Sequence, residues 1–132
     1  KTELGYGLDP ITESDAADRL TAIAGDYVLT VFEYYLTDKA GHSQSSRHAR
    51  RVLRSLDRFL GALQERVDPE QHLVVISSDH GNLEDLSTSS HTHHPVPLIG
   101  YGRGAKHFVD ARSIVDVTPS IVSAVAADTS EQ

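Results

Sequence analysis

The sequence has no cysteine, no methionine and no tryptophan among its 132 residues. The lack of cysteine excludes disulfide bonds, thiolate metal sites and a cysteine nucleophile, and it favours a cytoplasmic location. No apolar run approaches the roughly 20 residues that a membrane-spanning helix needs, so we expect no membrane partner. Since even the first residue, Lys1, is not a methionine, we expect the chain to be a piece of a longer polypeptide.

Positive charge is also scarce, because 12 Lys and Arg residues stand against 19 Asp and Glu residues, a net charge of −7 with His neutral. This excess of acidic groups disfavours nucleic acid and anionic membranes as partners. A local cationic site stays open, since a bound metal ion can dominate the field around it. With 39% hydrophobic and 23% charged residues, we expect one globular α/β domain over residues 1–132, with residues 1–11 as a linker or loop.

Periodic patterns divide the chain into helices and strands. The residues TESDAADRLTAIAG at 12–25 favour a short helix that Thr12 or Ser14 caps. β-branched and aromatic residues at 27–35 favour a strand, and apolar residues at helical spacing from 49 to 67 favour a long amphipathic helix. The remaining expected elements are strands at 72–76 and 96–102 and a helix at 116–127 capped by Thr118.

This order of elements predicts an α/β fold built on a layered sheet with helices on both faces. We expect a mostly parallel sheet, because the strand at 72–76 is uniformly apolar, as in strands covered on both faces. One antiparallel strand is expected near 96–101. The arginines on the polar face of the long helix could bind phosphate, but a solvated helix face is the simpler interpretation.

Three short segments, which we predict to be loops, carry the residues with chemistry, and each lies at the end of a predicted strand. They are TDKAGH at 37–42 (Asp38, His42), SDHGN at 78–82 (Asp79, His80) and HTHHPVP at 91–97 (His91, His93, His94). In open α/β sheets, ligands bind beyond the carboxyl ends of the strands. The first two segments meet this rule directly. The third meets it only if its strand runs antiparallel to the others, which we predict.

Carboxylate oxygens and imidazole nitrogens are ligands of Zn²⁺, Mn²⁺ and related ions. Asp38, His42 and one histidine of the third segment would make a three-ligand site with an open position, which a catalytic metal needs. Asp79 and His80 are adjacent and cannot easily chelate the same ion, so two ions bridged by substrate oxygens would use them better. Each segment alone also fits a turn cap or a solvated loop, and only the combination indicates a metal site.

The three segments together resemble the C-terminal metal-binding motifs of the alkaline phosphatase superfamily. The resemblance is closest to the branch of metalloenzyme domains that holds cofactor-independent phosphoglycerate mutases and phosphopentomutases, and it runs from about residue 27 to residue 118. It implies that Asp38, His42 and His91 bind one metal ion. It likewise implies a second ion at Asp79 and His80. The candidate accessory residues are His93, His94 and Asn82, and His94 stands where the mutases usually have Asn.

In that family a Ser or Thr nucleophile and a further Asp ligand lie far upstream, and nothing in this chain matches them. We therefore expect no catalytic residue here, and we predict the C-terminal metal-binding portion of a two-metal phosphoryl-transfer enzyme, inactive alone. A phosphomutase or phosphatase is favoured, while a diesterase or sulfatase stays open on the same scaffold.

The expected partners are the missing N-terminal half and a phosphorylated small molecule. The expected cofactors are two Mn²⁺ or Zn²⁺ ions in the parent, and one or none in this chain. The alternative is a non-catalytic metal-binding or partner-binding domain.

Overall fold

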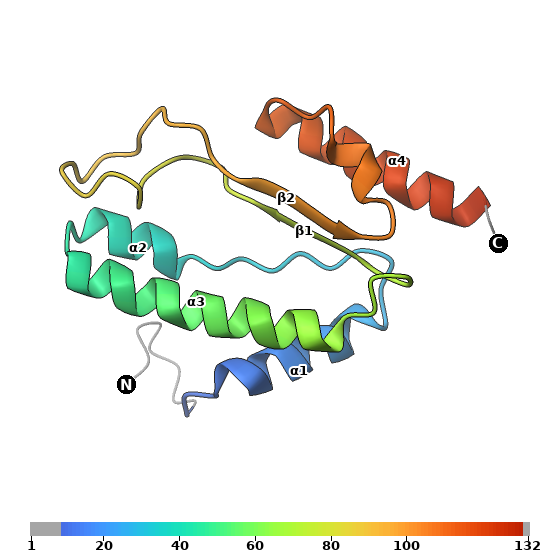
Figure 1. Cartoon of the computed structure of the whole chain (residues 1–132), viewed down its shortest axis with the longest axis horizontal. Coiled ribbons are helices and arrows are strands. Elements are labelled where there is room, and N and C mark those ends of the chain that lie inside the picture. The colour runs from blue at the N-terminus through green and yellow to red at the C-terminus, as the bar shows by residue number, and fades with distance from the viewer. Residues whose placement is uncertain (1–8, 131–132) are drawn as a thin grey trace.

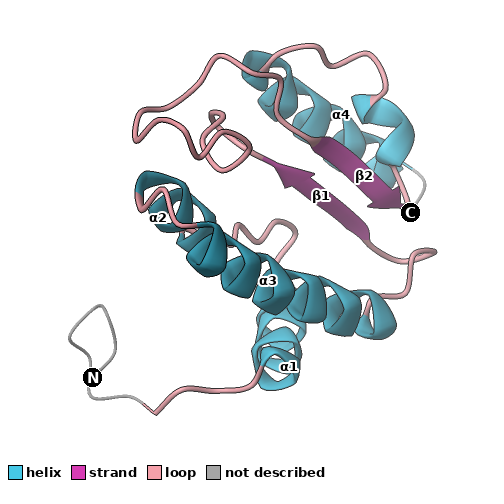
Figure 2. Cartoon of the chain, turned by 60° about the vertical axis from the view of Figure 1, so that its left-hand side comes forward, coloured by secondary structure: helices cyan, strands magenta, loops and turns pink. Residues whose placement is uncertain are grey.

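The computed structural model describes residues 9–130 and has helices on two sides of a small sheet (Figure 1). In chain order the elements are α1 (Glu13–Ala24), α2 (Leu36–His42), α3 (Ser46–Arg66), β1 (Leu73–Ser77), β2 (Leu98–Gly102), the 3-10 helices η1 (Ala105–Phe108) and η2 (Ile114–Asp116), and α4 (Val117–Ser130). Helices α1, α2 and α3 lie on one side of the strands and α4 on the other (Figures 1 and 2). The predicted α/β class is confirmed. Most of the opening loop predicted at 1–11 lies outside the described residues.

Strands β1 and β2 pair in antiparallel orientation. Their register places Leu73 opposite Gly102 and Ser77 opposite Leu98. The antiparallel strand predicted near 96–101 is therefore confirmed, and the segments at 78–82 and 91–97 adjoin the same end of the sheet. A mostly parallel sheet is not confirmed, because these two strands are the whole sheet within the part of the chain that the structure describes.

The segment at 27–35 was predicted as a strand, and this prediction is wrong. Figure 1 shows residues 28–34 as a drawn-out loop between α1 and α2. Val28 and Val31 are each 84% exposed, and no backbone–backbone hydrogen bond joins residues 28–34 to another described residue. β-branched side chains favour an extended backbone, but a strand forms only where a neighbour pairs with its N–H and C=O groups. That neighbour is not found among residues 9–130.

Helix α1 begins where the sequence predicts and packs against α3. Thr12 is the N-cap, and its hydroxyl accepts a hydrogen bond of 3.0 Å from the backbone N–H of Asp15. Ala17 of α1 is 0% exposed and Phe59 of α3 is 5% exposed. The Phe59 ring also contacts Phe32, with centroids 5.3 Å apart. The core on this side of the molecule is therefore built by α1, α3 and the segment between α1 and α2.

Two arginines of α3 form ion pairs with acids of α1. Arg58 Nη2 lies 2.6 Å from Glu13 Oε1, and Arg66 Nε lies 2.6 Å from Asp18 Oδ1. The hydrogen bond from Arg58 lowers the pKa of Glu13 from 4.5 to about 2. Both arginines therefore connect α3 to α1. For Arg58, which was interpreted as part of a solvated helix face, this is an additional role.

Replacing Arg58 with alanine should return the pKa of Glu13 toward 4.5, because the guanidinium that favours the ionised carboxylate is lost. Since the folded pKa lies below the ordinary value, the pair contributes stability that is fully present above about pH 4.5 and is lost as the pH falls toward 2. An NMR titration of the carboxyl groups measures this shift. Arg47→Ala, at an exposed site on the same helix, is the control, and an unmoved Glu13 midpoint in Arg58→Ala would contradict the assignment.

The residue that caps the start of α4 differs from the predicted one. Ser113 and Asp116 form a capping box at η2, which continues directly into α4 at Val117. Thr118 is therefore not the cap, and Pro119 lies in the first turn of α4, where a missing N–H is tolerated. Within residues 9–130, no helix combines the length and the apolar character needed to cross a membrane.

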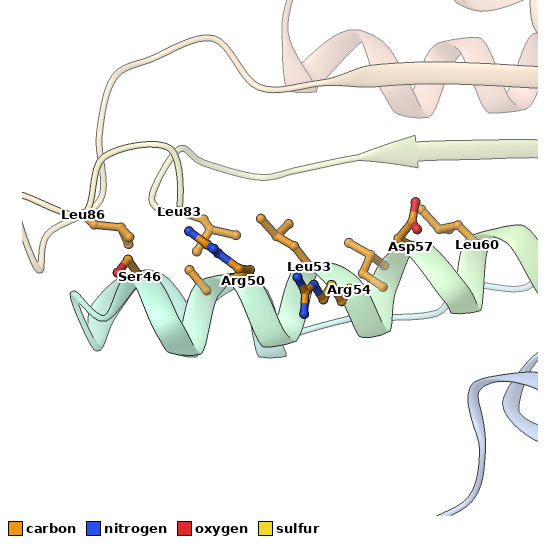
Figure 3. A pocket seen from close by; sticks show the side chains of 10 residues that line it. Ser46, Arg50, Leu53, Arg54, Asp57, Leu60, Leu83 and Leu86 are labelled. Atoms are coloured by element: carbon orange, nitrogen blue, oxygen red, sulfur yellow. The ribbon is translucent and has the colours of Figure 1, made fainter.

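The face of α3 that looks toward β1 is open (Figure 3). A groove of about 660 Å³ is lined there by apolar side chains, chiefly Leu53, Leu56, Leu60, Leu83 and Leu86. Leu53 is 48% exposed. Helix α3 packs on α1 and α2, whereas β1 packs on β2 and η1. The two groups of elements therefore leave the apolar groove between them in contact with solvent.

The chain exposes more surface than a compact monomer of its size. Its accessible surface is 9621 Å², whereas a folded monomer of 14.4 kDa would expose about 6,800 Å². The buried apolar residues in the described part are correspondingly few: Ala17, Ala40, Ala49, Val52, Phe59 and Phe108.

Candidate metal centre

Asp38 and His42 lie in a helix, and the prediction that they lie in a loop is wrong. Helix α2 spans Leu36–His42, and residues four apart in a helix lie on the same face, one turn from each other. Asp38 Oδ1 is therefore only 3.2 Å from His42 Nε2. The predicted pairing of these two side chains stands, because their spacing matches the helical turn.

His91 joins this pair from a loop that is distant in the sequence. Its Nε2 lies 3.5 Å from Asp38 Oδ1 and 3.2 Å from His42 Nε2. The ligand atoms of these three residues all lie within 4.8 Å of one another. Ligands held about 2.0–2.1 Å from a tetrahedral Zn²⁺ are themselves about 3.3 Å apart. We call these residues the three-ligand group, and its dimensions fit one divalent ion.

A hydrogen bond to a backbone oxygen orients the ring of His42. Its Nδ1 lies 2.6 Å from the backbone oxygen of Ser89. A carbonyl oxygen only accepts hydrogen bonds, so Nδ1 carries a proton, and in the neutral ring the lone pair would then be on Nε2, which faces Asp38 and His91. Metal-binding histidines typically donate their other N–H to a carbonyl or carboxylate in this way. The tautomer of His42 therefore also fits a metal ligand.

The pair predicted for a second ion lies beside the three-ligand group without being part of it. The His80 ring stacks on His91, with centroids 3.5 Å apart and planes inclined by 14°. Asp79 Oδ2 lies 3.4 Å from His80 Nε2, and the Asp79 side chain is 75% exposed. The Nδ1 atom of His80 is buried and has no hydrogen-bond partner. A buried polar atom of this kind is costly unless something satisfies it.

Asn82 is the candidate accessory residue that contacts the three-ligand group. It is 4% exposed, and its Nδ2 donates a hydrogen bond of 2.8 Å to Asp38 Oδ1. His93 and His94 are exposed, and neither belongs to the three-ligand group. Sequence reasoning named Asn82 but did not find its contact with Asp38, and it missed Ser89, because both contacts join residues more than 40 positions apart.

A bridge between two loops brings His91 to the helix. The backbone N–H of Thr92 donates a hydrogen bond of 2.9 Å to the Gly81 oxygen. The Thr92 hydroxyl donates to Glu84, and this hydrogen bond lowers the pKa of the Glu84 carboxyl. A Cβ atom at Gly81 would collide with the Thr92 hydroxyl. The loop after β1 and the loop before β2 are therefore held side by side, which carries His91 to α2.

The fold and the three-ligand group define an α/β domain with a candidate divalent-metal centre. A family model described as the Metalloenzyme superfamily matches residues 11–129. The chain belongs to this superfamily, and the resemblance inferred from the three motifs is confirmed.

Proteins similar to this chain include several 2,3-bisphosphoglycerate-independent phosphoglycerate mutases. The one from Cereibacter sphaeroides (strain ATCC 17025) is 30% identical over 126 residues, which cover 89% of this chain and 25% of that protein. The one from Nostoc sp. (strain PCC 7120) is 33% identical over 122 residues, which cover 77% of this chain and 23% of that protein. The chain thus spans about a quarter of the length of the curated relatives it matches. No solved structure matches it.

Proposed function

We propose that this chain is the metal-binding portion of a two-metal phosphoryl-transfer enzyme of the phosphomutase type. The observation that carries the proposal is the set of separations of 3.2, 3.2 and 3.5 Å among the Asp38 oxygen and the two imidazole nitrogens. Membership of the Metalloenzyme superfamily and similarity to phosphoglycerate mutases support phosphoryl transfer as the reaction.

Each member of the three-ligand group has a defined role in this proposal. Asp38 supplies an anionic oxygen, and His42 and His91 supply neutral nitrogens, a donor set that takes Mn²⁺ or Zn²⁺. Three protein ligands leave an open position for an oxygen of a phosphorylated small molecule. A divalent ion bound there would lower the pKa of a coordinated hydroxyl and neutralise phosphate charge.

Asp79 and His80 are the proposed ligands of a second ion beside the first. The unpaired, buried Nδ1 of His80 and its stacking on His91 support this assignment. As the family resemblance implies, a further Asp ligand and the Ser or Thr nucleophile would come from polypeptide outside these 132 residues. In this proposal the chain alone is inactive, and its residues bind and orient the ions without attacking phosphorus.

The proposed partner is the rest of the parent enzyme, covering the open apolar groove of α3 and the segment 28–34. Val28 and Val31 are each 84% exposed and Leu53 is 48% exposed, and apolar surface that is gathered in this way typically marks a site that a partner covers. An extended segment of the parent that pairs with residues 28–34 would also satisfy their backbone N–H and C=O groups. It would turn this drawn-out loop into the strand that its sequence favours.

A non-catalytic metal-binding or partner-binding domain is the alternative function. The lack of any match in this sequence to the family's nucleophile motif favours this alternative. The three-ligand group, which is complete within the chain, argues against it.

One experiment separates the two functions. The polypeptide encoded by the complete gene, supplied with Mn²⁺ or Zn²⁺, should isomerise phosphoglycerate in a coupled assay, whereas the 132-residue chain alone should not. Asp38→Asn in the complete polypeptide should abolish the activity, since it removes the anionic ligand. A complete polypeptide that binds the metal but neither isomerises phosphoglycerate nor hydrolyses phosphate esters would favour the alternative.

A further inference from the structure

We propose that Asn82 is a positioning residue of the metal centre. Its side-chain amide holds the Asp38 carboxylate in the orientation that the ion requires. Glu84 accepts hydrogen bonds from both Asn82 and Thr92, and Thr92 is the residue directly after His91. This inference rests on the proposed metal site and assigns roles to three residues outside the three-ligand group.

The amide group of Asn82 faces Asp38 through two contacts. Its Nδ2 lies 2.8 Å from Asp38 Oδ1 and 3.4 Å from the Asp38 backbone oxygen. Both neighbours only accept hydrogen bonds, so the NH₂ group of the amide, and not its oxygen, must point at them. Asp38 Oδ1 is also the oxygen that lies nearest His42 Nε2 and His91 Nε2. Asn82 therefore fixes the oxygen atom that faces both histidines.

The position of Asn82 is set by this contact with Asp38. The residue is 4% exposed, and its side-chain oxygen is buried without a hydrogen-bond partner. That oxygen packs against Gly41, where a Cβ atom would collide with it. A buried amide oxygen without a partner is costly. The unpaired amide oxygen is retained here because the NH₂ group of the same amide must reach Asp38. Gly41 has no side chain and so leaves space for the amide oxygen.

A chain of hydrogen bonds connects Asn82 to the loop that carries His91. The backbone N–H of Asn82 donates to Glu84 Oε2 at 2.7 Å. Glu84 Oε1 accepts from the Thr92 hydroxyl, and the Thr92 N–H donates to the Gly81 oxygen at 2.9 Å. Because Thr92 follows His91 directly, one network orients Asp38 on α2 and places His91 opposite it.

A neutral amide suits this position better than a charged side chain. A lysine or arginine would neutralise Asp38 and compete with the cation for it, and an acidic side chain would repel the carboxylate. An amide N–H orients the carboxylate while leaving its charge available. Ligating carboxylates are commonly held by such hydrogen bonds, and removal of one typically costs about 10–100-fold in metal affinity.

Asn82→Leu tests the inference, because leucine has nearly the same size and no hydrogen-bond donor. Calorimetric titration of the 132-residue chain with Zn²⁺ should give an affinity about 10–100-fold below that of the wild type. The visible absorption of the Co²⁺-substituted site should change as well, since the geometry of Asp38 is no longer fixed. Ser120→Ala is the control, because it removes a hydrogen bond of the same length, 2.8 Å, to the Asp116 backbone oxygen, on the other side of the sheet from α2. It should leave affinity and spectrum unchanged.

The outcomes separate this inference from the proposed function. Wild-type protein that binds Zn²⁺, with Asn82→Leu binding it equally tightly and with the same Co²⁺ spectrum, would overturn the positioning role alone. Wild-type protein that binds no Zn²⁺ or Mn²⁺ would overturn the proposed metal site, and the positioning role with it.

A measurement on the unaltered protein covers the case in which Asn82→Leu does not fold. Asn82 is the only asparagine in the sequence, so selective ¹⁵N labelling of asparagine gives one side-chain NH₂ signal. Its protons should exchange slowly with water and shift when Zn²⁺ is added, and they should not shift in His91→Ala. Exchange as fast as that of a free amide would overturn the inference.

Discussion

Replacing His91 with alanine should weaken the binding of Zn²⁺ or Mn²⁺ at least about 100-fold. The variant keeps Asp38 and His42, which come from a single helical turn, but loses the ligand that closes the site from the opposite loop. Two protein ligands bind a divalent ion far more weakly than three, because water molecules occupy the remaining coordination positions. Isothermal titration calorimetry of the metal-free chain measures the effect.

His93→Ala is the matched control for this prediction. His93 lies two positions along the same loop, is exposed, and is outside the three-ligand group, so its removal should leave the affinity unchanged. The His91 side chain is itself 49% exposed, so His91→Ala should not lower the unfolding temperature of the metal-free protein appreciably. Equal losses of affinity in the two variants would contradict the choice of His91 as a ligand.

Phe59→Ala should lower the free energy of unfolding by about 3–5 kcal/mol. Phe59 is 5% exposed, and its ring contacts Phe32 and Tyr34, with centroids 5.3 and 6.4 Å away. Truncation would remove the side chain that joins α3 to the segment between α1 and α2, and it would leave a cavity. Urea denaturation followed by circular dichroism measures the change.

Leu53→Ala on the same helix is the control for this stability prediction. Leu53 lines the open groove and is 48% exposed, so in the 132-residue chain its loss should cost less than about 1 kcal/mol. In the complete polypeptide the cost should be larger, because the proposed partner covers the groove. If Phe59→Ala and Leu53→Ala were equally destabilising in the short chain, the assignment of the core would be wrong.

Local patterns were sufficient to predict most helices of this protein. The capping residue Thr12 and the apolar periodicity of α3 act over a few neighbouring positions, and these two helices form as expected. The strand predicted at 27–35 did not form, because a strand depends on contacts between distant positions. A strand depends on a partner from elsewhere in the chain, and β-branched composition carries no information on whether that partner is present.

The sequence by itself determined which residues could form a metal centre, because ligand chemistry belongs to side-chain type. The resemblance of the motifs then distinguished His91 from His93. Only the tertiary structure decided that His91 reaches α2, that Ser89 orients His42, and that Asn82 holds Asp38. These contacts join positions more than 40 apart. The antiparallel pairing of β1 and β2 brings the loops that carry Asn82 and His91 to one end of the sheet, and there both loops contact α2.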